Sequence, residues 1–146
     1  MRLISARARG WQASDARLPL SAPHQLAERA FRRGDIPAVR RFARAFGTRM
    51  GIGSARLADF VLAVSEAAAC ATAAGPCTAR VRLWVTGTRA FCEVRGDGLL
   101  LRRVARVTQP GEEETLRRWV LSRISDHVSV ASGPDGAWVL LSMTVA

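Results

Sequence analysis

The chain has 146 residues, enough for one compact domain with its own hydrophobic core. Hydrophobic residues make up 49% of it, which excludes a disordered chain. Charged residues interrupt the longest apolar run, so no segment reaches the roughly 20 apolar residues of a membrane span. Because the N-terminus also lacks the apolar core of a signal peptide, we expect a cytoplasmic protein that stays out of the membrane.

The net charge is +10, and all 22 basic residues are arginine. Lysine, asparagine and tyrosine, whose codons are rich in A and T, are absent, which indicates a G/C-rich bacterial genome. No basic run is interleaved with aromatic residues in the manner of proteins that bind single-stranded nucleic acid. A basic nucleic-acid-associated module is therefore kept as an alternative and is not favoured.

Three cysteines occur, at Cys70, Cys77 and Cys92. Their number is odd and they show no C-x-x-C spacing, which favours reduced, buried thiols over a zinc site. The sequence predicts no metal ligands.

We expect two parts, an N-terminal arm over residues 1–23 and one domain over residues 24–146. The arm is rich in Arg, Ser and Ala, so it is predicted to be mobile or loosely attached. The weak alternation of Gln25–Phe31 predicts a first strand. A turn at Gly34–Asp35 follows, and Asp35 is expected to cap the next helix.

Two amphipathic helices are predicted. The first spans Pro37–Met50, and Gly51–Gly53 follows as a flexible joint. The second spans Ala55–Gly75, with Ser54 as its N-cap. The first has one apolar stripe and a basic exterior formed by Arg40, Arg41, Arg44 and Arg49.

Two hairpins and a third helix complete the predicted elements. Thr78–Thr86 and Arg89–Arg95 alternate with period two and flank a tight turn, so they form the first hairpin. Thr115–Asp126 is predicted as a helix. Val128–Ala131 and Ala137–Val145 flank a Gly-Pro-Asp-Gly turn and form the closing hairpin.

Glu66 lies in the alanine-rich half of the second helix, with no basic residue three or four positions away. A solvated face is the ordinary explanation of such a glutamate, and a catalytic carboxylate is the alternative. The surrounding letters, Val61 to Ala71 (VLAVSEAAACA), resemble the signature helix of the GHKL, or histidine-kinase-type, ATPases. They are most similar to the small bacterial anti-sigma-factor serine kinases.

This resemblance implies that Glu66 is the general base and that Cys70 stands where the family has the asparagine that holds magnesium. It also aligns Asp97 and Gly98 with the second and third positions of the family's adenine-binding motif, while Gly96 replaces the adenine-reading aspartate. Thr115 and Arg117 replace the two phosphate-loop glycines. A thiol is a poor ligand for Mg²⁺, which requires oxygen, so the ATP motifs are degenerate.

The fold expected is an α/β (α+β) two-layer sandwich of the GHKL type, with a mixed, mostly antiparallel sheet and helices on one face. The function expected is that of an anti-sigma regulatory factor-like protein that controls transcription by binding a sigma factor or an anti-anti-sigma protein. No cofactor is expected. The alternative is an ATP-dependent serine/threonine kinase of the same family, with Mg-ATP as its cofactor; a homodimer is left open.

Overall fold

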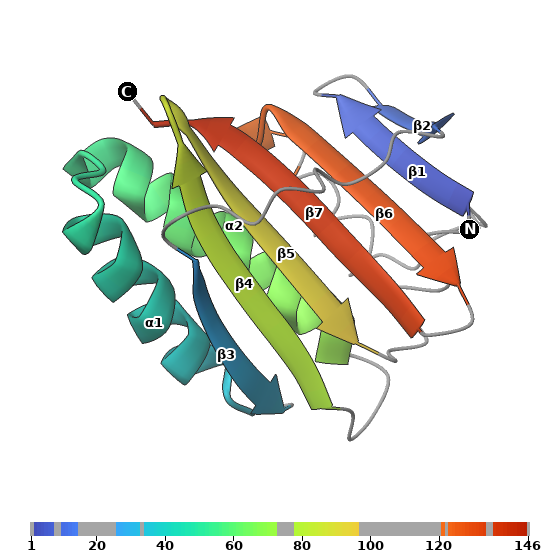
Figure 1. Cartoon of the computed structure of the whole chain (residues 1–146), viewed down its shortest axis with the longest axis horizontal. Coiled ribbons are helices and arrows are strands. Elements are labelled where there is room, and N and C mark those ends of the chain that lie inside the picture. Colours follow the sequence, from blue (N-terminus) through green and yellow to red (C-terminus); the bar gives the residue numbers. More distant parts are fainter. Residues whose placement is uncertain are drawn as a thin grey trace.

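A computed structural model describes residues 2–7, 10–14, 26–32, 34–72, 78–96, 121, 123–133 and 136–145. Seven strands form one sheet and two helices lie side by side on one of its faces, giving two layers (Figure 1). The strand order is β2-β1-β6-β7-β5-β4-β3, and each neighbouring pair is antiparallel. The fold is thus α+β, and the sheet predicted to be mixed is antiparallel throughout the strands described.

The predicted hairpins are confirmed. Strand β4 (Thr78–Thr86) pairs with β5 (Arg89–Gly96), and Gly87 takes the positive φ of 59° that a two-residue hairpin turn requires. Strand β6 (His127–Gly133) pairs with β7 (Gly136–Thr144). Because β7 also pairs with β5, the two hairpins join into the centre of the sheet.

The two edges of the sheet come from the N-terminal part of the chain. The segment predicted as a first strand does form one, β3 (Ala27–Arg32), and it pairs with β4. At the other edge β1 (Arg2–Arg7) pairs with both β6 and β2 (Gly10–Ser14). Residues expected to form a loose arm therefore form strands, since adding a strand to an open edge requires backbone hydrogen bonds rather than an apolar pattern.

The first helix, α1 (Ile36–Arg49), packs one apolar stripe against the rest of the molecule. Val39, Ala43 and Phe46 are buried, and Phe42 and Met50 are partly buried, as the spacing predicts. Asp35 precedes the helix, but its side chain accepts a hydrogen bond from the Arg32 backbone N–H at 3.0 Å and makes no capping bond to the helix. The prediction of a side-chain cap at Asp35 was therefore wrong.

The segment between the helices is a hydrogen-bonded turn rather than the expected flexible joint. Gly51 has φ 77°, and the amides of Gly51 and Ile52 donate to the carbonyls of Thr48 and Gly47 at 3.1 and 2.9 Å. This arrangement closes the C-terminus of α1 in a Schellman motif and buries Ile52.

Helix α2 (Ser54–Thr72) is the central core helix. It begins at Ser54, and the carbonyl of Gly53 accepts the first helical hydrogen bond, from Leu57 N–H at 2.8 Å, so Gly53 and not Ser54 occupies the N-cap position. The side chain of Leu57 fills the space left by the missing side chain of Gly47 in α1, which permits close packing of the two helices. Phe60 and Val64 are fully buried beneath the sheet.

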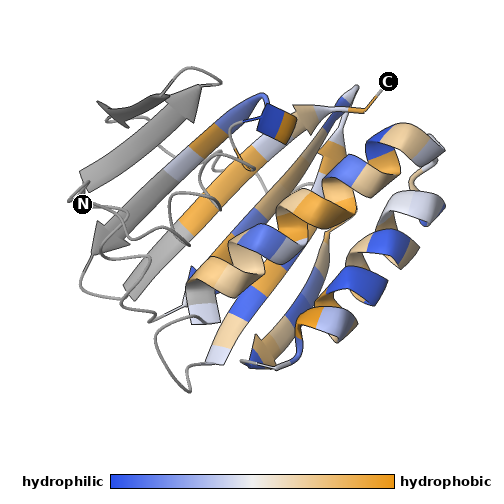
Figure 2. Cartoon of the chain, turned by 180° about the vertical axis from the view of Figure 1, so that it is seen from behind, coloured by the Kyte–Doolittle hydropathy of each residue, from blue (hydrophilic) through white to orange (hydrophobic). Residues whose placement is uncertain are grey.

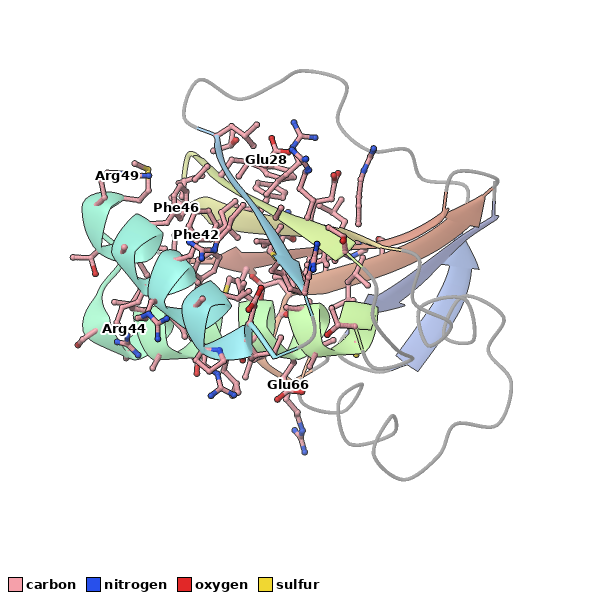
Figure 3. All side chains as sticks on the ribbon, turned by 90° about the horizontal axis from the view of Figure 1, so that it is seen from below. Glu28, Phe42, Arg44, Phe46, Arg49 and Glu66 are labelled. Carbon is pink, nitrogen blue, oxygen red and sulfur yellow. The ribbon has the colours of Figure 1, made fainter. Side chains whose placement is uncertain are left out.

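The face of the sheet toward the helices is apolar, as the alternation predicted. Val81 pairs with Val94 and Leu83 with Cys92 across β4 and β5, and all four are fully buried. Burial raises the pKa of the Cys92 thiol, which keeps it protonated and unreactive. We call the opposite face of the sheet, which neither α1 nor α2 covers, the helix-free face (Figure 3).

Candidate functional site

Glu66 lies on the side of α2 that faces away from the sheet (Figure 3). Its neighbour one turn earlier, Leu62, is 40% exposed, whereas Ala63, Val64 and Ala67 are buried. Glu66 itself is half-buried. The structure therefore places the predicted catalytic carboxylate on the outer surface of the helix layer, where a solvated glutamate and a site residue would both lie.

Cys70 lies one helical turn after Glu66 but is 5% exposed and belongs to the hydrophobic core. A buried thiol offers no hard oxygen ligand, so it cannot take the part of a magnesium-holding asparagine. Among the residues described, no group of three or more His, Cys, Asp or Glu side chains comes together to hold a metal ion.

The other two predicted ligands, Asp97 and Gly98, lie outside the described residues, and so does Cys77. The structure follows the chain up to Gly96, the last residue of β5, where the resemblance places a replaced aspartate. Most of the predicted helix Thr115–Asp126, including Thr115 and Arg117, is likewise outside the described part; Leu121, Arg123 and Ile124 are helical. The structure thus describes two of the four predicted site residues, Glu66 and Cys70, which lie one turn apart on α2.

The outer side of α1 carries a cluster of arginine side chains. Figure 2 shows several strongly hydrophilic segments along this helix, and in Figure 3 Arg44 points away from the sheet while Phe42 and Phe46 lie on the side toward it. Arg40, Arg41 and Arg44 are all exposed. Arg44 lies four residues after Arg40 and three after Arg41, so the three side chains fall within about 100° of the helix circumference. We call these three residues the basic face.

Among the described residues, no ion pair involves the basic face. Helix α1 contains no acidic residue, and the ion pairs found within the described ranges use arginines of other elements. Arg40 and Arg44 stand at i and i+4, where like charges destabilise a helix by about 0.2–0.5 kcal/mol. Arg49 differs, because its guanidinium lies 5.7 Å from the centre of the Phe46 ring and close to the helix C-terminus.

A buried charge cluster on the helix-free face was not anticipated. The side chain of Glu93 is 4% exposed, and its Oε1 lies 3.0 Å from Arg95 Nε and 3.6 Å from Arg82 Nη1. The alternation of β5 correctly predicts that Glu93 points away from the helices. Alternation cannot show, however, that Glu93 is buried on the helix-free face. The opposite charges at paired positions, Arg82 on β4 and Glu93 on β5, were the available signal.

The fold and these surfaces define a class: an α+β protein with an antiparallel sheet, two helices on one face and a basic outer helix. A scan against protein-family models finds no match, and a search of curated proteins finds no related sequence. Neither helix of the described residues is both long enough and apolar enough to cross a membrane.

Proposed function

We propose that this chain is an anti-sigma regulatory factor-like protein that binds a sigma factor or an anti-anti-sigma protein without using ATP. One observation carries the proposal: the basic face of α1 is exposed and takes part in no ion pair within the described residues, although its charges repel one another. An acidic partner surface would relieve that repulsion and give fast, oriented association. The resemblance of the α2 sequence to anti-sigma kinases supplies the partner class.

The placement of Cys70 supports the loss of ATP chemistry. In the proposed family the residue at this position supplies an oxygen to magnesium, whereas Cys70 is a core thiol. The kinase alternative would need another oxygen ligand near Glu66.

We expect Mg-ATP to bind with a dissociation constant in the millimolar range or weaker. Each missing partner for a charged ligand group removes about 1.5–3 kcal/mol, and several of the family's partners are replaced in this sequence. Isothermal titration calorimetry with Mg-ATP measures the affinity directly. A micromolar dissociation constant would instead support the kinase alternative, with Glu66 as its general base.

We expect the substitutions Arg40→Glu, Arg41→Glu and Arg44→Glu, made together, to weaken partner binding strongly while leaving the melting temperature nearly unchanged. All three side chains are exposed, so the fold does not depend on them. The partner is captured by affinity purification from the native cells and its binding is then measured at low and high salt. The wild-type complex should weaken as salt rises, because exposed charge pairs are screened.

A matched pair of variants distinguishes an effect of the basic face on partner binding from an effect of the overall net charge. The double variant Arg40→Glu/Arg44→Glu and the double variant Arg29→Glu/Arg32→Glu both lower the net charge from +10 by four, to +6, and Arg29 and Arg32 are exposed on β3. The first should lose affinity and the second should not. Equal loss in both variants would assign the effect to overall charge and would contradict a specific interface on α1.

A further inference from the structure

A pocket of about 410 Å³ opens at one end of strands β5, β7 and β6. Its lining includes Arg89 and Phe91 from β5, Leu140 and Ser142 from β7, His127 from β6, and Asp126 just before β6. This volume lies within the range of about 300–1,000 Å³ typical of small-molecule sites. Phe91, Ser142 and His127 alternate with core residues of their strands, so they lie on the helix-free face, away from Glu66 and the basic face.

A row of side chains crosses the sheet at this pocket. Trp84 pairs with Phe91, Phe91 with Ser142, and Ser142 with His127, on four successive strands. The rings of Trp84 and Phe91 are stacked, with centroids 5.3 Å apart and planes 5° from parallel. Aromatic side chains therefore stand at the first, second and fourth places of the row, and the third place holds the small Ser142.

Ser142 lines the pocket, and the gap over its small side chain lies between the ring-bearing residues Phe91 and His127 on the neighbouring strands. Neighbouring strands are about 4.8 Å apart, so a planar ring seated over Ser142 would lie about that distance from both Phe91 and His127. Ring centroids 4.5–7 Å apart are in the range of favourable stacking. A flat aromatic ligand would thus complete the stack begun by Trp84 and Phe91, and Leu140 adds an apolar wall.

The pocket also carries charge. Arg89 supplies a guanidinium at its lining. Asp126 is already engaged, because its carboxylate accepts hydrogen bonds from the hydroxyl and the backbone N–H of Thr144. Burial acts to raise the pKa of Asp126, but the Thr144 hydrogen bonds together with Arg56 and Arg89 outweigh it and hold that pKa below its usual value. Asp126 is therefore ionised at neutral pH and held by Thr144. Arg89 is the arginine in the pocket lining, so it is the group whose charge suits a ligand anion.

We propose that this pocket binds a small planar aromatic carboxylate, with its ring over Ser142 between Phe91 and His127 and its carboxylate at Arg89. Three features select this class: the stack selects a flat ring, the guanidinium selects an anion, and the volume limits the ligand to a small molecule. The site is independent of the partner-binding function proposed for α1.

The binding test uses the full chain and three matched probes in calorimetry and protein-observed NMR. Indole-3-acetate has both the planar ring and the carboxylate, 3-methylindole lacks the charge, and cyclohexylacetate lacks the planar ring. We expect saturable binding of indole-3-acetate and binding about tenfold or more weaker for the other two. Equal affinity for all three, or no binding of indole-3-acetate, would overturn the proposal.

Two variants locate the binding. Ser142→Phe places a ring in the gap itself, so it should abolish indole-3-acetate binding. Arg89→Gln should weaken indole-3-acetate about tenfold and leave 3-methylindole unchanged, whereas Arg29→Gln, at an exposed arginine of β3, should change neither. Full affinity in a folded Ser142→Phe protein would refute the site; should that variant not fold, unchanged affinity in Arg89→Gln would refute it.

Discussion

Replacing Phe60 with alanine should lower the free energy of unfolding by about 3–5 kcal/mol. Phe60 is fully buried in α2, and its ring centre lies 6.3 Å from that of Phe46 in α1. The substitution removes a large apolar side chain at the contact between the two helices and the sheet, and the surrounding strands cannot close the cavity because they are held in register by their hydrogen bonds. Urea denaturation followed by circular dichroism measures the change.

The control is Leu62→Ala in the same helix. Leu62 is 40% exposed on the outward side of α2, so its truncation should change the stability by less than about 1 kcal/mol. A loss at Phe60 no greater than the loss at Leu62 would mean that α2 is not the core helix.

Arg82→Met should lower the free energy of unfolding by about 3 kcal/mol, because it removes a cation from the buried carboxylate of Glu93. Glu93 would retain only Arg95 among its two described cations, and the Arg95 side chain is 57% exposed, so water screens that pair. This loss of stability is at the lower end of the range for breaking a buried ion pair, because Arg95 still lies next to Glu93. Urea denaturation again provides the measurement.

A second substitution separates the unpaired charge from lost packing. In the double variant Arg82→Met/Glu93→Leu the buried carboxylate is gone, so more than half of the lost stability should return. Arg95→Met alone should have an effect below about 1 kcal/mol, since Arg82 still faces Glu93. If the two single arginine variants are equally destabilised, or the double variant is less stable than Arg82→Met, the buried-charge explanation is wrong.

The local elements were predictable because each depends on residues close in sequence. The three- and four-residue spacing of Val39, Ala43 and Phe46 is enough to predict an amphipathic helix and its buried side. The same holds for the β4–β5 hairpin, where period-two alternation flanks a turn that only glycine forms easily. Helix ends were less predictable, although Asp35 and Ser54 are both residue types that cap helices. Asp35 stands at the N-cap of α1 but its side chain makes no capping hydrogen bond, and Gly53 takes the N-cap position of α2.

The candidate sites likewise include features that the sequence could predict and features that it could not. The exposure of Arg40, Arg41 and Arg44 follows from the apolar stripe on the other side of α1, so sequence alone placed the basic face. Glu66 was placed on the correct helix, but its position on the outward side, opposite the buried Val64, appears only when α2 packs on the sheet.

What only the tertiary structure decided is how distant strands meet. No local pattern shows that β1 pairs with β6 or that β7 lies between β5 and β6, because edge pairing uses backbone groups that every sequence possesses. Yet this order places Ser142 between Phe91 and His127. The pairing of Glu93 with Arg82, by contrast, lies within the local β4–β5 hairpin, and only the burial of Glu93 needed the tertiary structure. The sequence by itself determined the helices, the hairpins and their apolar faces, whereas the pocket arises from contacts between residues far apart in the chain.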